Sequence, residues 1–170
     1  MVFTADSRQI VWIRYDESQV KEFSMPMFHL DAEDKGAYAY TYQYPKAGDD
    51  NSKVSLMSYD IKSHQTRQMQ LPLDADGYIP RIVTTSDPAK VLAFTLNRHQ
   101  DCLRVYAVNP LSTTCKLIVE DKVDKYINEN VFSNLVVTDL FVHIRYMMLT
   151  TTPTFLITLV IFFLDRDRKR

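Results

Sequence analysis

Residues 44–60 read YPKAGDDNSKVSLMSYD, a turn that leads directly into a strand. Pro45 cannot continue a helix, and Gly48 with the Asp-Asp-Asn run after it favours a turn. After Lys53 apolar and polar residues alternate, which predicts a half-buried strand. The centre of the chain is therefore predicted to be β structure.

An internal repeat surrounds this stretch. Residues 4–16, TADSRQIVWIRYD, align with residues 85–97, TSDPAKVLAFTLN, so that a Thr, a small residue and an Asp precede a turn and an apolar strand in both. The next two strands also recur, because 54–60 and 66–71 correspond to 103–108 and 115–119. Residues 78–84 supply a first strand for the second unit. Four-stranded meanders repeated at roughly 40 to 50 residues are typical of propeller blades.

The repeat predicts an all-β fold, a partial β-propeller of about two four-stranded antiparallel blades. The first blade is expected to be incomplete and to lack its innermost strand, because the sequence begins at the turn before the second strand. Two blades cannot close a ring. We assign residues 1–134 to this propeller fragment and residues 135–170 to a tail of different character.

The pattern YPKAG-x-x-N-x-x-V at residues 44–54 resembles a segment of the propeller of the dipeptidyl peptidase IV family. Residues 13–28, IRYDESQVKEFSMPMF, are similar to the strand and loop before that segment, particularly in bacterial members. Residues 76–110 and 124–130 resemble the strands that follow it, and no resemblance is visible beyond residue 135 or so. Long ordered matches of this kind are more specific than one short motif.

The resemblance implies a function for a larger parent protein. Family members are serine exopeptidases that remove N-terminal dipeptides with proline in second place. An α/β-hydrolase domain supplies the nucleophile, and a glutamate pair on the propeller binds the free amine of the peptide. That pair lies just upstream of the turn at residue 4. The acidic pair Asp16-Glu17 follows its strand instead, so its role is not transferred.

The chain itself offers no catalytic site. None of its three glycines lies in a Gly-x-Ser-x-Gly turn, and the four histidines are scattered, so no triad is present. Asp74-Ala75-Asp76-Gly77 is read as a turn rather than a calcium loop, and Arg98-His99-Gln100 as a polar strand end. We therefore assign no catalytic, substrate-binding or metal residue and no cofactor, and expect the fragment alone to be inactive.

The two cysteines are predicted to be free thiols. A hairpin with its turn at residues 109–114 places Cys115 opposite Val108. Cys102 then lies some six residues further along its strand, on the order of 20 Å away, which is too far for a disulfide.

The first unit carries an insertion, residues 22–51, that the second unit lacks. A strand there would place Tyr38, Tyr40, Tyr42 and Tyr44 on one face. Either these rings cover the propeller's own side or they form a contact surface. In the family, the excursion before YPKAG is an arm that takes part in a homodimer. We therefore expect residues 22–45 to be a dimerisation arm, with Tyr38, Tyr40 and Tyr42 on its contact face.

The tail contains an uncharged run at residues 147–164, followed by six charged residues. This run meets the length rule for a membrane span, although five threonines and Pro153 weaken that reading. The alternative is a frameshift, because a reading frame shifted by one base over residues 161–170 allows a sequence that resembles the family.

Composition and the start of the chain narrow the remaining classes. A net charge of −1 gives no reason to expect nucleic acid. The N-terminus shows no secretory signal, although the resemblance implies a parent outside the cytoplasm, periplasmic or on the cell surface. The alternative function is a stand-alone propeller module that binds protein or carbohydrate.

Overall fold

The computed structural model describes residues 1–28, 36–127, 136–137, 141–147 and 156–162, and this part of the chain consists of strands and turns. The first four-stranded sheet contains β1 (Val2–Phe3), β2 (Gln9–Asp16), β5 (Lys53–Asp60) and β6 (Gln65–Gln68). The second contains β7 (Tyr78–Thr84), β8 (Val91–Leu96), β9 (Cys102–Val108) and β10 (Cys115–Lys122). A two-stranded sheet pairs β3 (Glu22–Phe28) with β4 (Ala37–Gln43).

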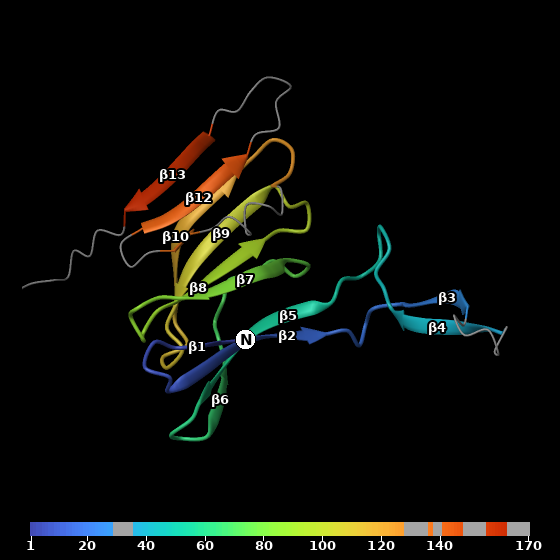
Figure 1. The fold of residues 1–170 in the computed structure, drawn as a ribbon, viewed down its shortest axis with the longest axis horizontal. Coiled ribbons are helices and arrows are strands. Elements are labelled where there is room, and N and C mark those ends of the chain that lie inside the picture. The colour runs from blue at the N-terminus through green and yellow to red at the C-terminus, as the bar shows by residue number, and fades with distance from the viewer. Residues whose placement is uncertain (29–35, 128–135, 138–140, 148–155, 163–170) are drawn as a thin grey trace, which may run out of the picture.

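The two four-stranded sheets have the same antiparallel order, so they are two copies of one meander (Figure 1). Residues 4–16 and 85–97 occupy equivalent places, since β2 and β8 are each the second strand of their sheet. The innermost strands β1 and β7 approach each other, as neighbouring blades of a propeller do. The predicted all-β partial propeller is confirmed.

The turns of the two blades repeat as closely as the strands. Before the second strand, the Thr4 hydroxyl donates to the Gln9 carbonyl at 3.4 Å, and the Thr85 hydroxyl donates to the Lys90 carbonyl at 2.9 Å. After the third strand, Asp60 accepts from the amides two and three residues later, and Asn109 does the same. Such Asx turns close a hairpin through side-chain chemistry, which explains why Asp or Asn stands at both places.

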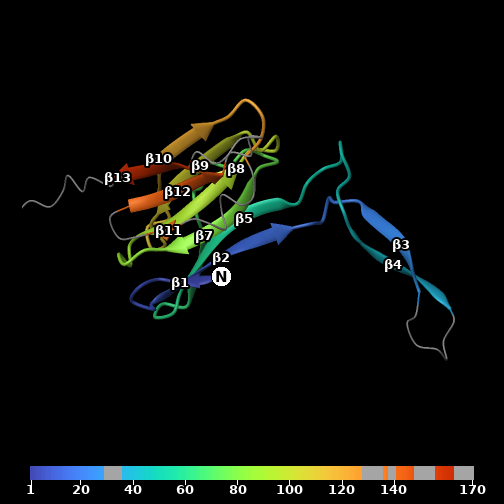
Figure 2. The same ribbon diagram turned by 45° about the horizontal axis from the view of Figure 1, so that its top comes forward.

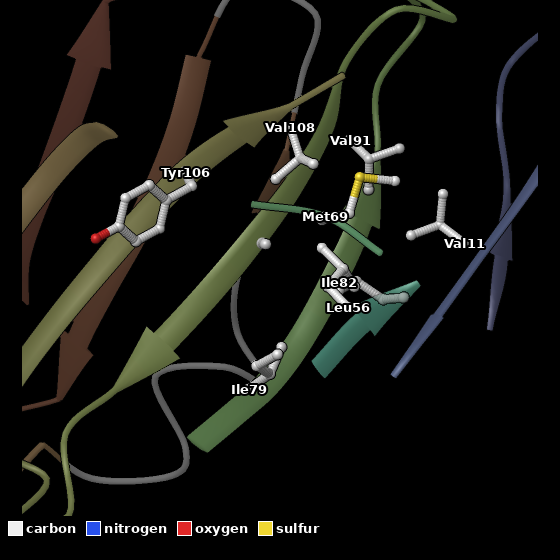
Figure 3. Close-up of a cluster of buried hydrophobic side chains, with 9 residues drawn as sticks. Val11, Leu56, Met69, Ile79, Ile82, Val91, Tyr106 and Val108 are labelled. Carbon is white, nitrogen blue, oxygen red and sulfur yellow. The ribbon is translucent and has the colours of Figure 1, made fainter. Parts of the chain in front are cut away.

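A hydrophobic cluster joins the two blades. Val11 and Leu56 of the first sheet pack against Ile82, Val91 and Val108 of the second (Figure 3). Two polar ties accompany this packing: the Ser58 hydroxyl donates to the Pro110 carbonyl at 2.8 Å, and Tyr106 donates to the Pro72 carbonyl at 3.2 Å. Each fully buried aliphatic side chain contributes about 1.5–3 kcal/mol, so this cluster holds the blades together.

The second blade also packs on its other face. Leu92, Phe94 and Leu96 of β8 join Leu103 and Val105 of β9 in a separate cluster. Because β8 has neighbouring strands on both edges and packing on both faces, all six of its residues are buried. This is the pattern of a strand in the middle of a core.

One expectation needs correction, and one of the two interpretations of the tail does not fit residues 156–162. The innermost strand of the first blade is not missing, because Val2 and Phe3 form the short strand β1 opposite Val11 and Ile10. In the tail, β12 (Phe141–Met147) pairs with β11 (Val136–Val137) and β13 (Leu156–Phe162), near β9 and β10 (Figure 2). Residues 156–162 are therefore a strand rather than part of a hydrophobic helix. Their sequence LITLVIF is rich in β-branched and aromatic residues, which favour strands.

In the part of the chain that the structure describes, no helix is long and apolar enough to cross a membrane. Residues 148–155 and 163–164 of the uncharged run lie outside the described residues.

Both cysteines are free, as predicted. The register of β9 and β10 places Cys115 opposite Val108 and Cys102 opposite Lys122. The two cysteines therefore lie at opposite ends of the β9–β10 pair.

Candidate interaction surface

The strands β3 and β4 form a ribbon, called the arm below, that points away from both blades in two views (Figures 1 and 2). Their register pairs Phe23 with Tyr42, Met25 with Tyr40 and Met27 with Tyr38. Directly opposed residues of an antiparallel pair lie on the same face. These six side chains therefore share one side of the ribbon, called the aromatic face below.

The rings of the aromatic face contact one another along the arm, and Tyr44, just after β4, continues the row. The Tyr40 and Tyr42 ring centroids lie 5.3 Å apart, and those of Tyr42 and Tyr44 lie 5.8 Å apart. Phe23 meets Tyr42 edge to face at 6.1 Å. These distances are in the range at which aromatic pairs attract beyond simple burial. Tyr40 and Tyr44 nevertheless remain 52% and 51% exposed, so the row of rings is a surface and not a core.

The opposite face of the arm carries mostly small and polar residues, with Phe28 at the end of β3 opposite Ala37 and 72% exposed. Ala37, Ala39 and Thr41 alternate with the tyrosines, and the Ser24 and Thr41 hydroxyls are hydrogen-bonded at 2.6 Å. The three tyrosines of β4 thus all lie on one face of the arm. A large apolar face that is exposed in one chain is the usual sign of a protein contact.

A turn at residues 46–49 closes the base of the arm. The Asp49 amide donates to the Lys46 carbonyl at 3.0 Å, and Gly48 has a φ of 87°, which favours glycine. The Lys46 ammonium lies 4.4 Å from the centroid of the Phe23 ring, a cation–π contact. The YPKAG stretch is therefore a turn before a strand, as predicted, and it also caps the aromatic face.

Charge at this turn centres on Asp49. Lys21 donates to its carboxylate, and the Lys46 amide donates to the second carboxylate oxygen at 3.2 Å. The ammonium of Lys21 lowers the pKa of the Asp49 carboxyl, so that this group stays ionised at neutral pH.

Sequence reasoning found half of the aromatic face. Tyr38, Tyr40 and Tyr42 lie together on it, but Phe23, Met25 and Met27 were not assigned. The same signal marks both strands, because EFSMPMF alternates apolar residues just as AYAYTYQ alternates tyrosines. Neither alternating sequence by itself predicts that the two strands pair with each other.

The other residues considered in the sequence analysis lie in turns or make local hydrogen bonds. Gly77 donates its amide to the Asp74 carbonyl at 2.9 Å, which makes residues 74–77 a turn, and Arg98 and Gln100 lie in the turn after β8. His64 bonds through Nδ1 to the Tyr59 hydroxyl at 2.8 Å. Among the described residues, no three His, Cys, Asp or Glu side chains are grouped as metal ligands would be.

A cavity of about 260 Å³ opens between the two blades near the arm. Its lining is apolar apart from Gln100 and the Tyr15 and Tyr78 hydroxyls, and it includes Val54 and Leu96. These side chains offer neither a nucleophile with a base nor a charged anchor. This cavity therefore has the lining of an apolar pocket.

Two adjacent meanders with their first strands side by side define the class of protein, a β-propeller. Within that class, the family profile of the dipeptidyl peptidase IV (DPP IV) N-terminal region matches residues 1–148. The chain therefore belongs to this family. The match extends past residue 134, where we placed the end of the propeller fragment.

Relatives and solved structures agree with this assignment. The chain is 33% identical over 126 residues to a probable dipeptidyl-aminopeptidase B of Emericella nidulans, covering 68% of the chain and 14% of that protein. The crystal structure of Porphyromonas gingivalis dipeptidyl peptidase 4 superposes with a TM-score of 0.76 at 38% identity, covering 84% of the chain and 20% of that protein. A putative dipeptidyl aminopeptidase IV from Bacteroides ovatus, 16% identical with a TM-score of 0.69 over 85% of the chain and 20% of its own, shares the fold. The chain thus spans about one seventh of the curated relative's length.

Proposed function

We propose that this chain is a portion of the propeller of a serine exopeptidase that releases Xaa-Pro dipeptides from peptide N-termini. The match of the family profile over residues 1–148 carries this proposal. In the complete enzyme the propeller gates and binds the peptide substrate, and an α/β-hydrolase domain provides the nucleophile. The sequence of this segment holds no Gly-x-Ser-x-Gly turn, so the nucleophile is assigned to the hydrolase domain.

Hydrolysis of a chromogenic Gly-Pro or Ala-Pro substrate tests whether catalysis requires the hydrolase domain in addition to this segment. We expect release by a complete enzyme that carries this segment and none by the 170-residue chain. Turnover by the chain alone that a serine-directed inhibitor abolishes would overturn the proposal. Failure of the complete enzyme to release dipeptides would overturn the proposed activity.

The arm is proposed to be a homodimer contact of the complete enzyme. Two observations support this: its aromatic face is exposed, and the second blade is complete without a counterpart. Tyrosines give a large, rigid and amphipathic contact area, which is why they are enriched at the centres of interfaces. In a two-fold dimer the same patch on both subunits can meet, and the edges of the ribbon are then covered as well.

Matched charge substitutions on the two faces of β4 test the dimer. In the complete enzyme, Tyr40→Asp with Tyr42→Asp buries charge in the proposed contact, and we expect sedimentation velocity to show monomers. Ala39→Asp with Thr41→Asp adds the same charge to the same strand on the opposite face, and should leave the dimer intact. If the tyrosine variant stays dimeric at dilute concentration, the arm is only a surface loop.

The same resemblance leads us to propose that the complete enzyme lies outside the cytoplasm, in the periplasm or on the cell surface. Cell fractionation followed by immunodetection of the propeller tests this, and recovery in the cytoplasmic fraction alone would contradict it.

A further inference from the structure

The base of the arm is tied to the second blade at one residue. Asp49 lies in the turn after the arm, and its main-chain carbonyl accepts a hydrogen bond from Arg98 Nη2 at 2.7 Å. Arg98 belongs to the turn between β8 and β9, 49 residues further along the chain. The bond therefore links the segment that carries the arm to a blade that does not carry it.

The Asp49 side chain holds the two strands of the arm together at the same point. Lys21 precedes β3 and Lys46 follows β4, and both donate to this carboxylate, Lys21 through its ammonium and Lys46 through its amide at 3.2 Å. One main-chain bond runs beside them, from the Tyr44 amide to the Lys21 carbonyl at 3.0 Å. The Asp49 side chain is only 17% exposed.

These contacts matter because of where they lie. An exposed ion pair by itself contributes little to stability. An isolated two-stranded ribbon, however, is marginally stable and can swing about the segments that connect it. A tie at the base acts on the whole length of the arm, so a small energy there restricts a large motion.

We propose that Asp49 and Arg98 form a clamp that fixes the direction in which the arm leaves the blades, and so positions the aromatic face. The Asp49 side chain joins the two arm strands, and its carbonyl joins them to the second blade through Arg98. Both residues are positioning residues. The clamp is a property of the chain itself; only its consequence for dimerisation rests on the proposed function.

The two halves of the clamp can be cut separately. Arg98→Met removes the donor from the second blade and leaves the carboxylate with its lysine and amide partners. Asp49→Asn removes the charge that Lys21 binds and keeps the main-chain carbonyl for Arg98. His99→Ala, in the same turn as Arg98, and Asp50→Asn, beside Asp49, are matched controls.

Distances between spin labels on the arm and on the second blade test the clamp. Ketone-bearing amino acids at positions 39 and 116, exposed on β4 and β10, carry the labels in the full chain, so the two cysteines remain. We expect one narrow distance distribution in the parent chain and in both controls. Arg98→Met and Asp49→Asn should each lose the narrow peak and give a broad distribution.

Amide hydrogen exchange separates this effect from unfolding. In both clamp variants β8 and β9 should keep their protection, and the Lys46 amide should exchange faster in Asp49→Asn than in Arg98→Met. A narrow distribution retained by either clamp variant would overturn the proposal. Broadened distances with an unchanged dimer in the complete enzyme would support the clamp and count against the arm as the dimer contact.

Discussion

Strands β8 and β4 both carry large hydrophobic side chains and pair antiparallel with their neighbours. Strand β8 nevertheless lies in the core, and β4 lies on the surface. All six residues of β8, VLAFTL, are buried, whereas β4, AYAYTYQ, is exposed except for the half-buried Tyr42. Neighbouring elements make the difference, because β8 lies between two strands and packs on both faces while β4 pairs with β3 in a ribbon. The local sequence favours a strand in both places, whereas the neighbouring elements decide which side chains are buried.

The contrast separates what folds the chain from what the chain offers to others. Packing free energy is concentrated in the clusters on the two faces of the second blade, where aliphatic side chains leave water. The arm keeps its largest side chains in water, so their burial is still available to a contact. Substitutions in β8 and in the arm should therefore differ in their effect on the free energy of unfolding.

Truncation in β8 should cost the most. Phe94 is fully buried, so Phe94→Ala removes packing and leaves a cavity, for an expected loss of about 3–5 kcal/mol. Tyr40→Ala on the arm should change the free energy of unfolding by well under about 1 kcal/mol, because exposed positions contribute little. Urea unfolding of the two variants measures both values. Equal losses would mean that the arm is part of the folding core.

Burial should also slow the chemistry of a thiol in the second blade. Desolvation raises the pKa of the Cys115 thiol to about 11, so almost none of it is thiolate at pH 8. We expect its reaction with an aromatic disulfide reagent to be at least about tenfold slower than that of a free small-molecule thiol. Unfolding in urea should restore the ordinary rate. A native chain that reacts as fast as the unfolded one would contradict the burial.

The repeated turns should differ in acid. The main-chain amide of Ser63 donates to Asp60 and lowers the pKa of its carboxyl. Because the pKa of Asp60 is lower in the folded chain, its carboxylate stabilises the turn at pH values above its ordinary pKa of about 4. This stabilisation is lost as the pH falls through the lowered folded-state pKa. Asn109, which caps the equivalent turn, does not titrate.

Hydrogen-exchange protection factors measure that difference. At acid pH the Lys62 and Ser63 amides should lose protection a few-fold, while the Leu111 and Ser112 amides should not. Asp60→Asn should abolish the pH dependence of the first turn. Equal losses in both turns would show that the whole hairpin edge opens in acid.

Much of this fold could be predicted from residue patterns, and the reasons are specific. The aligned Thr-x-Asp segments gave equivalent strands because the same side-chain bonds close both turns. The pairing of Cys115 with Val108 followed from a short hairpin, whose length leaves little choice of register. The YPKAG turn followed from Pro45 and Gly48, whose backbone preferences are strong.

Other features could not be predicted because they depend on distant partners. The short strand β1 exists through its pairing with β2, although two residues alone carry no strand signal. Residues 156–162 form a strand opposite 141–147, and an apolar run alone does not distinguish helix from strand. The hydrogen bond between Arg98 and Asp49 joins residues that are 49 positions apart in the sequence, and no local sequence pattern predicts it.

Replacing the arm by the short turn of the second blade tests most directly whether the arm is an addition to a complete blade. Tyr15 pairs with Val54 as Leu96 pairs with Leu103, so residues 16–53 can be replaced by the sequence of residues 97–102. We expect amides of β2, β5, β8 and β9 to keep their hydrogen-exchange protection, with only small losses at the turn around Arg98. Loss of protection throughout β2 and β5 would show that the arm is needed to build the first blade, and would contradict its role as an outward-facing contact element.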